Sequence, residues 1–347
     1  MRRAAVAALV CAVGVAAAGA EVPARHHGQH GGRRLTDPEL DAALVIDART
    51  GSVLYARNAA AARHPASLTK MMTLYLLFEE LRLHKITLET NLAVSANAAA
   101  QPRSHLRLRV GNAISVDMAI KGIVVCSAND AAVAVAEALG GTERHFSELM
   151  TAKARQLGMA HSFFHNATGL PDDAQQTTAE DLARLARHLV YDFPEYFAYF
   201  RITQMTWHGD DYSTHNALIG NYQGADGIKT GYIEASGYNL VGTATRGGTR
   251  LIAVVMGGLT AEKRDEATVA LLDATFEGLP AKTLHPPAYP RHDLARPPKP
   301  ATTASRTAPA SIASTMTIAL AILGDPGSLL AWILAVTVSE TAKAGEP

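Results

Sequence analysis

The sequence has little cysteine, few aromatic residues and no excess of either charge, and these shortages exclude several classes of protein. Two cysteines in 347 residues are too few for a disulfide framework or for a cysteine-rich zinc or iron–sulfur site. Lys and Arg number 32, and so do Asp and Glu, so the basic excess expected of a nucleic-acid-binding protein is missing. The motifs HExxH, GxSxG and CxxC are also absent, which argues against the enzymes that they mark.

The first 20 residues have the pattern of a secretory signal. Two arginines precede an Ala-rich apolar stretch that ends at Ala18-Gly19-Ala20, an A-x-A cleavage pattern. We therefore expect an exported, periplasmic protein, cleaved after Ala20. Cleavage removes Cys11 and leaves Cys126 without an intramolecular partner. The alternative is an N-terminal transmembrane anchor, for which the stretch is short and rich in Ala instead of Leu.

The remaining chain divides by composition into a globular middle and two unlike ends. Residues 21–37 contain His26, His27 and His30, which suit a flexible leader better than a metal site because nothing apolar nearby would hold them rigid. Residues 316–338 are apolar but interrupted by Gly324-Asp325-Pro326-Gly327, so they favour either a membrane-associated hairpin or an unfolded tail. The predicted divisions are a signal peptide (1–20), a leader (21–37), a globular domain (38–280), a Pro-rich linker (281–315), an apolar tail (316–338) and a polar end (339–347).

The patterns in the globular middle predict an α+β fold. Short apolar runs around a Gly-containing turn indicate two strands within residues 42–58, and residues 236–259 have the pattern of a β-hairpin. Between them lie three predicted helical regions, at 67–83, 113–139 and 177–190. Strands at both ends with helices between them indicate helices packed on a mostly antiparallel sheet.

The first of three chemical motifs is Ser67-Leu68-Thr69-Lys70, at the polar start of an otherwise apolar helix. Residues three apart share a helix face, so the Ser67 hydroxyl can lie beside the Lys70 amine. A neutral amine can take the serine proton. Burial and a second nearby cation would both lower the pKa of Lys70. The positive helix N-terminus also disfavours an ammonium, and its N–H groups can hold an oxyanion.

The other two motifs are Ser127-Ala128-Asn129 and Lys229-Thr230-Gly231. If the first lies in a loop, both of its polar side chains can face one cleft, where the serine passes protons and the amide grips a substrate peptide bond. The second places a permanent cation, a hydroxyl and a small residue at a strand edge, where an extended peptide can align. Each motif is common by chance. All three motifs in this order, with the first on a core helix and the last leading into a hairpin, are not expected by chance.

With these motifs the sequence resembles the low-molecular-mass, penicillin-binding, serine-type D-alanyl-D-alanine carboxypeptidases, a peptidase S11-like family. The likeness covers about residues 38–280. It implies the β-lactamase/transpeptidase-like fold, in which helices sandwich an antiparallel sheet and a helical lobe forms one wall of the cleft. The segments that carry it are Pro65–Thr73, Ser127–Asp130, Asn166–Pro171, Asp226–Tyr232 and Ser236–Leu240.

The resemblance implies removal of the terminal D-Ala from peptidoglycan stem peptides, through an acyl-enzyme on Ser67 that β-lactams also form. Lys70 would be the base, and Ser127 and Asn129 would assist. No metal or other cofactor is expected. Cys126, directly before Ser127, is expected to be a small buried residue because nothing basic adjoins it in the sequence.

Recognition of the substrate's terminal carboxylate would fall to Lys229, Thr230 and Arg264. The oxyanion hole would consist of the N–H groups of Ser67 and Tyr232. Arg264 lies in the charged run 263–266, which is also typical of a solvent-exposed helix face. Many relatives carry a further β-rich domain and an amphipathic anchor. Only 68 residues follow Leu279 here, and they are largely Pro-rich, so we expect that domain to be missing.

Three alternatives share this chemistry. A β-lactamase often carries an E-x-x-L-N that activates water, but the segment 180–184 lacks the Asn and lies on a predicted helix. A D,D-endopeptidase, which cuts cross-links, would use the same residues. A non-catalytic penicillin-binding sensor would be favoured by loss of Ser67, Lys70 or Lys229, and all three are present.

Overall fold

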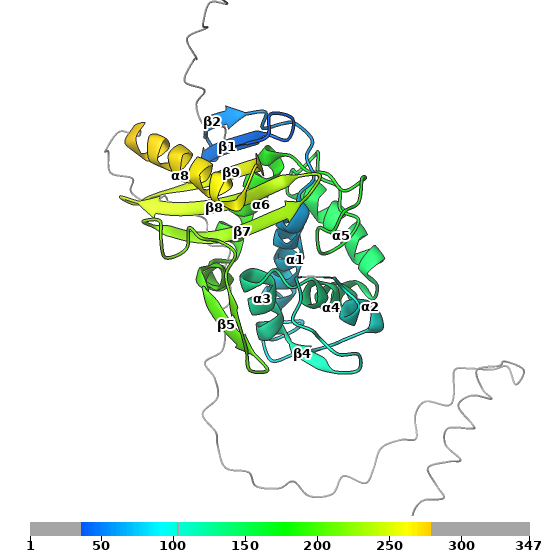
Figure 1. The fold of residues 1–347 in the computed structure, drawn as a ribbon. Helices are drawn as coiled ribbons and strands as arrows, with labels where there is room; N and C mark the ends of the chain where they lie inside the picture. Colours follow the sequence, from blue (N-terminus) through cyan, green and yellow to red (C-terminus); the bar gives the residue numbers. More distant parts are fainter. Residues whose placement is uncertain (1–35, 103, 279–347) are drawn as a thin grey trace, which may run out of the picture. The chain divides into compact units, whose positions relative to one another are not determined.

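The computed structural model describes residues 36–102 and 104–278 (Figure 1). The predicted signal peptide, most of the leader, the Pro-rich linker, the apolar tail and the polar end lie outside the described residues and stay expectations. Within the described ranges, no helix is long and apolar enough to cross a membrane. The same ranges hold no group of three or more His, Cys, Asp or Glu side chains arranged to bind a metal ion.

The centre of the fold is a five-stranded sheet in the order β2-β1-β9-β8-β7, with every neighbouring pair antiparallel. The first strand therefore pairs with the last, and Leu44 lies opposite Val254. This pairing closes the domain and leaves β7 at an open edge. The strands are β1 (Ala42–Asp47), β2 (Val53–Arg57), β7 (Ala225–Ile233), β8 (Gly237–Arg246) and β9 (Thr249–Gly258).

Helices cover both faces of the sheet, with α8 (Ala261–Gly278) on one side and α6 (Ala179–Asp192) on the other (Figure 1). The central strands are apolar at successive positions because both of their faces are buried. Alternate side chains go to opposite faces. Val45 packs in the cluster with Leu272 of α8, whereas its neighbours Leu44 and Ile46 join the larger core on the other face.

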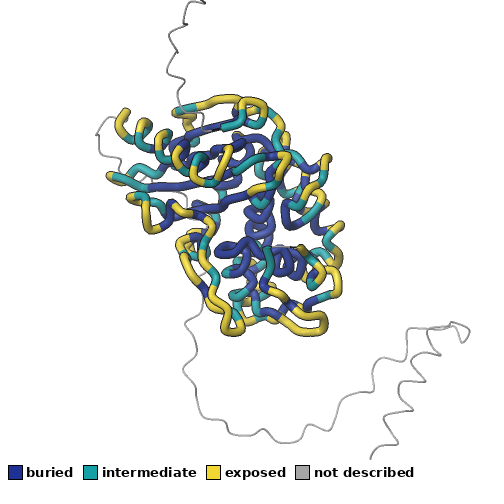
Figure 2. Tube along the Cα trace, in the orientation of Figure 1, coloured by how far each residue is buried: buried dark blue, intermediate teal, exposed yellow. Residues whose placement is uncertain are grey.

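A helical lobe packs beside the sheet around α1 (Lys70–Arg82). Ten residues of α1 are buried, and its trace runs through the interior in Figure 2. A helix that is apolar nearly all round belongs in a core. The lobe also contains α2 (Ala96–Ala99), α3 (Val116–Val125), α4 (Asn129–Gly140), α5 (Glu143–Gln156), β3 (Asn91–Ala93) and β4 (Ala113–Ser115).

The predicted α+β architecture with a mostly antiparallel sheet is confirmed, including the hairpin of β8 and β9. The predicted helix from Ser67 instead begins with a 3₁₀ turn, Ala66–Thr69, and α1 starts at Lys70. Sequence patterns did not reveal four short elements between α6 and β7. These are α7 (Pro194–Phe197), a 3₁₀ turn (Ala198–Arg201), β5 (Gln204–Trp207) and β6 (Asp210–Ser213).

Candidate active site

A cleft of about 510 Å³ collects side chains from all three motifs. Its walls come from the 3₁₀ turn before α1, the start of α4, the edge strand β7 and the first turn of α8. Segments far apart in the sequence therefore meet at one place. The predicted site residues that line it are Ser67, Ser127, Asn129, Thr230, Gly231, Tyr232 and Arg264.

Ser67 and Lys70 are in contact, as the motif predicted. The Lys70 Nζ lies 3.1 Å from the Ser67 Oγ. A 3₁₀ turn has three residues per turn, so side chains three apart eclipse one another, which brings this pair closer than an α-helical face would. The Ser67 side chain remains partly exposed in the cleft, whereas Lys70 is fully buried beneath it.

The surroundings of Lys70 fit a neutral amine. Its Nζ also lies 2.7 Å from the Asn129 Oδ1 and 2.6 Å from the Thr168 carbonyl oxygen. Burial first, and the nearby charge of Lys229 second, lower the pKa of Lys70 well below its ordinary value. A neutral amine has two N–H groups, which these two oxygens accept, and one lone pair, which then faces the Ser67 hydroxyl. The amine is thus arranged to receive a proton from Ser67.

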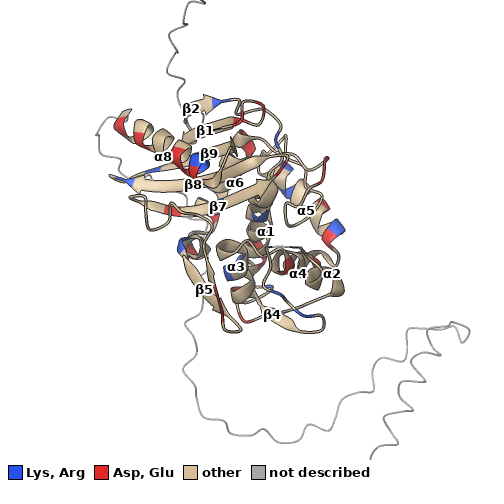
Figure 3. Cartoon of the chain, in the orientation of Figure 1, with Lys and Arg blue, Asp and Glu red and all other residues tan. Residues whose placement is uncertain are grey.

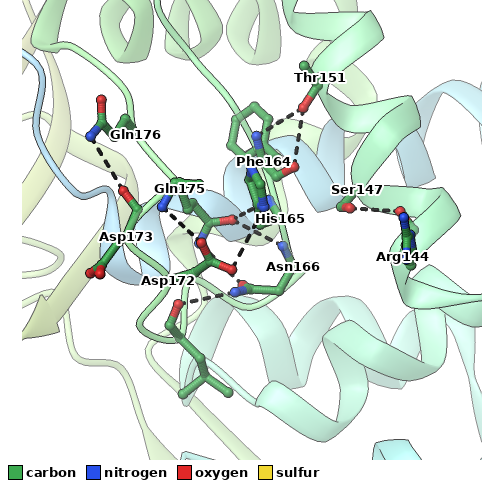
Figure 4. Close-up of polar contacts among 12 residues, drawn as sticks. Arg144, Ser147, Thr151, Phe164, His165, Asn166, Asp172, Asp173, Gln175 and Gln176 are labelled. Carbon is green, nitrogen blue, oxygen red and sulfur yellow. Dashed lines mark hydrogen bonds and ion pairs between the residues drawn. The ribbon is translucent and has the colours of Figure 1, made fainter.

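The Thr168 carbonyl is held in place by a hydrogen-bonded loop, whose bonds between Gln175 and the segment His165–Asn166 are drawn in Figure 4. The Asn166 Oδ1 accepts from the N–H groups of Gly169, at 2.7 Å, and Thr168, at 3.2 Å. The Gln175 Oε1 accepts from the N–H groups of His165, at 2.9 Å, and Asn166, at 3.2 Å. These bonds fix the loop that orients Lys70. The loop lies in Asn166–Pro171, a segment that carries part of the family resemblance but had been given no role from the sequence.

Replacing Gly169 with alanine is expected to disrupt this arrangement. Gly169 has φ +84°, and an added Cβ would lie 1.8 Å from the Ala66 carbonyl oxygen. Because the obstacle is backbone next to Ser67, we expect a loss of about 3 kcal/mol or more in the free energy of unfolding. Gly111→Ala is the matched control, because Gly111 has φ +80° with no atom within 4 Å of its added Cβ. It should lose only about 1 kcal/mol. Equal losses in chemical denaturation would contradict the clash.

The second motif differs from its prediction in one respect. Ser127 adopts φ +59°, and its buried hydroxyl has no hydrogen-bond partner in the part of the chain that the structure describes. Asn129 is not in a loop but is the first residue of α4. Its side chain accepts from Lys70 and donates to the Pro102 carbonyl oxygen at 3.0 Å. The amide thus orients the predicted base, in addition to any contact with substrate.

The third motif lies on β7, with Lys229 buried and its Nζ donating to the Thr230 carbonyl oxygen at 3.0 Å. Burial first, and the charge of Arg264, lower the pKa of Lys229 to about 7. The sequence pattern predicts a permanent cation, and burial makes the charge of Lys229 in the unliganded site sensitive to pH near neutrality. Gly231 gives room for a close approach, but to this chain's own backbone: an added Cβ would lie 3.0 Å from the Ser67 nitrogen.

Arg264 and Tyr232 both line the cleft, but Arg264 is buried and Tyr232 is half exposed. Arg264 is 3% exposed, so the alternative of a solvent-exposed helix face is wrong. Its Nε donates to the Asp265 carboxylate at 2.9 Å, and its Nη1 lies 3.4 Å from the Asn239 carbonyl oxygen. The Tyr232 ring is half exposed and packs 4.2 Å from that of Tyr238, centre to centre.

One residue that lines the cleft was missed by sequence reasoning. His215 lines the cleft, and desolvation in the cleft, with the charges of Lys229 and Arg264, lowers its pKa. A single histidine outside any motif gave no signal. Asp130 is buried, and its carboxylate accepts from the N–H groups of Leu106 and Leu108. This ties the loop at the cleft to the second motif.

Cys126 is buried, as expected. Its thiol donates to the Gly122 carbonyl oxygen at 3.2 Å. Burial raises its pKa to about 11, so a reactive thiolate is disfavoured at neutral pH.

The family model for D-alanyl-D-alanine carboxypeptidases, peptidase family S11, matches residues 33–260. The chain belongs to this family. The S11 match covers the described domain from before β1 to the end of β9.

Curated relatives of this S11 chain include D-alanyl-D-alanine carboxypeptidase DacF of Bacillus subtilis, 36% identical over 69% of this chain and 62% of its own length. DacA of Escherichia coli is 35% identical over 69% of this chain and 62% of its own length. The similar region thus spans less than two thirds of these relatives.

Solved structures agree on the fold. Penicillin-binding protein 5 from Haemophilus influenzae has a TM-score of 0.67 and 31% identity, covering 71% of this chain and 72% of its own. Penicillin-binding protein D2 from Listeria monocytogenes, in its cefotaxime-bound form, has a TM-score of 0.63 and 30% identity, covering 70% of this chain and 100% of its own.

Proposed function

We propose that this protein is a serine-type D-alanyl-D-alanine carboxypeptidase that removes the terminal D-Ala from peptidoglycan stem peptides. The observation that carries the proposal is the contact between a partly exposed hydroxyl and a buried amine whose two other partners are hydrogen-bond acceptors. This arrangement activates a serine without a histidine or a metal.

The acylation step follows from these contacts. The Ser67 proton passes to the Lys70 amine while the Oγ attacks the carbonyl carbon of the penultimate D-Ala. The N–H groups of Ser67 and Tyr232 stabilise the resulting oxyanion. Gly231 supports this role, because its close approach to Ser67 brings the edge strand against the start of α1. The C–N bond then breaks, and the leaving amine takes the proton from Lys70 through Ser127, which returns Lys70 to a neutral amine. Water later hydrolyses the ester and restores the Ser67 hydroxyl. A β-lactam acylates Ser67 by the same attack on its ring amide.

Recognition of a free carboxylate explains a preference for chain ends. Arg264 and Thr230 line the cleft, and Lys229 lies buried next to Thr230 on β7. A bound carboxylate favours the charged form of Lys229, so substrate raises the pKa that burial has lowered.

Replacement of Lys229 by alanine is expected to weaken the binding of substrates with a free carboxylate by about 10- to 100-fold, because a charge-assisted contact is lost. An amidated peptide should change little. In the wild type, kcat/KM for the carboxylate substrate should fall as pH rises above about 7, because the free enzyme's Lys229 loses its proton there. The amidated peptide should lack this decline. Equal loss for both peptides would contradict carboxylate recognition.

The test of the activity uses an acyl-D-Ala-D-Ala peptide and a fluorescent penicillin with the purified protein. Release of D-Ala supports the carboxypeptidase. Rapid hydrolysis of the penicillin would identify a β-lactamase, and stable labelling without D-Ala release would identify a binding sensor. Cleavage of a cross-linked muropeptide at a comparable rate would identify an endopeptidase.

We further infer that the protein is periplasmic and attached to the inner membrane. The signal-like residues 1–20 and the apolar residues 316–338 support this location. Cell fractionation should place the full chain with membranes and a chain lacking residues 316–338 in the soluble periplasm. A soluble full chain would contradict the attachment.

A further inference from the structure

A second cleft of about 390 Å³ lies between the segment Leu106–Ala113 and the tip of the β5–β6 hairpin. It shares no lining residue with the catalytic cleft. Leu106 and Leu108 are buried beside it, and Trp207 packs partly against the core. Its rim is polar and exposed, with Arg107, Arg109 and His208.

The rim is held in a defined shape by a buried carboxylate. The Asp130 carboxylate accepts from the N–H groups of Leu106, at 2.9 Å, and Leu108, at 3.0 Å. With both flanking groups turned inward, Arg107 takes the left-handed backbone conformation at φ +58°. Its guanidinium reaches outward to 3.6 Å from the Asp210 carboxylate, across the cleft. Arg107, which precedes β4, thus faces Asp210 of the hairpin. Figure 3 marks basic positions in the segment before β4 and acidic positions in the β5–β6 hairpin.

The charges of the rim favour an anion. Arg107 is partly neutralised by Asp210, but Arg109 has no acidic partner among the described residues. The Trp207 and His208 rings lie 4.2 Å apart, centre to centre, and form an aromatic surface next to these guanidinium groups. Arg pairs well with carboxylates, and an indole face packs against apolar faces such as that of a sugar ring. The cleft therefore suits a ligand that carries both a carboxylate and a sugar ring.

The two clefts are joined by the same two segments. Ser104 lines the catalytic cleft and Leu106 the second, and β6 leads from Asp210 at the second cleft to His215 at the first. A polymer bound at the catalytic serine therefore has a path along these segments to the second cleft. Peptidoglycan contains both sugar rings and stem carboxylates, and it is the substrate of the proposed function.

We propose that the second cleft binds the carboxylate-bearing glycopeptide part of peptidoglycan, away from the scissile D-Ala-D-Ala. The proposal rests on the proposed function for the identity of the polymer. The site would add affinity for natural substrates and contribute nothing to short synthetic peptides that end at the catalytic cleft.

The test uses a disaccharide-tripeptide, which lacks the terminal D-Ala-D-Ala and so measures this cleft independently of turnover. In calorimetric titration of the full-length protein, Arg109→Gln should weaken binding on the order of 3- to 10-fold and Arg109→Glu by more. Arg144→Gln is the matched control, because that side chain is 92% exposed on α5 and lies 3.8 Å from Glu148. It should leave the affinity unchanged.

Two further measurements separate this proposal from the proposed function. Penicillin labelling of Ser67 and D-Ala release from a short peptide should be unchanged in Arg109→Gln, whereas kcat/KM for a disaccharide-pentapeptide should fall with the affinity. The proposal would be overturned if the disaccharide-tripeptide did not bind. It would also be overturned if Arg109→Gln bound the fragment as tightly as the control Arg144→Gln. Loss of its binding once penicillin occupies Ser67 would also overturn it, because the fragment would then be in the catalytic cleft. Failure of D-Ala release alone would overturn only the proposed function.

Discussion

Replacing Ser67 with alanine is expected to abolish covalent labelling by a fluorescent penicillin and to lower D-Ala release on the order of 10⁴- to 10⁶-fold, because loss of a nucleophile removes the covalent pathway. The substitution deletes one hydroxyl that makes a single side-chain contact, 3.1 Å from the Lys70 Nζ, and lies partly in solvent. The free energy of unfolding should therefore change by about 1 kcal/mol or less.

The readout is labelling on a denaturing gel, together with a thermal melt that shows the variant folded. Ser213→Ala is the matched control, since Ser213 is an exposed serine at the end of β6 that does not line the catalytic cleft. It should label at the wild-type rate. A folded Ser67→Ala protein that still forms a stable penicilloyl adduct would place the nucleophile elsewhere and end the assignment.

The fold could be predicted where periodicity was strong. The continuous apolar runs of β1 and β9 and the apolar α1 follow from burial on all sides, which sequence patterns show directly. The order of strands could not be obtained in this way, because the pairing of β1 with β9 joins residues about 200 positions apart. The short β5–β6 hairpin also escaped prediction, since each of its strands has only four residues and most of these are exposed.

Some features of the site could likewise be predicted from the sequence, and others could not. The Ser67–Lys70 contact follows from local spacing and was predictable. The carbonyl of Thr168, which completes the surroundings of the amine, is a backbone group on a distant loop, and no side-chain motif reports it. The charge state of Lys229 depends on its burial and on Arg264. These are properties of the folded domain, so a sequence motif can name the residue but not its pKa.

Replacing Lys70 with methionine is expected to slow acylation on the order of 10²- to 10⁴-fold, the usual contribution of a general base. Methionine is a flexible side chain that suits a buried position, but it has no proton acceptor of comparable strength. The substitution leaves the Asn129 Oδ1 and the Thr168 carbonyl oxygen without the Lys70 donor. A loss of about 1–3 kcal/mol in the free energy of unfolding should follow, so the variant must be assayed well below its melting temperature.

The pH profile distinguishes a base from a structural lysine. Because the pKa of Lys70 is lowered by burial and by Lys229, the wild-type acylation rate should rise with pH on the acid side as the amine loses its proton. In Lys70→Met this rise should disappear, whereas a lysine that only held the loop would leave it in place. Lys153→Met, which removes a partly buried lysine paired with Glu79 at 2.9 Å, should keep both the rate and the rise. If Lys70→Met were slower but its acylation rate still rose with pH, another group would be taking the Ser67 proton. The rise on the acid side reports the titration of the group that acts as the base.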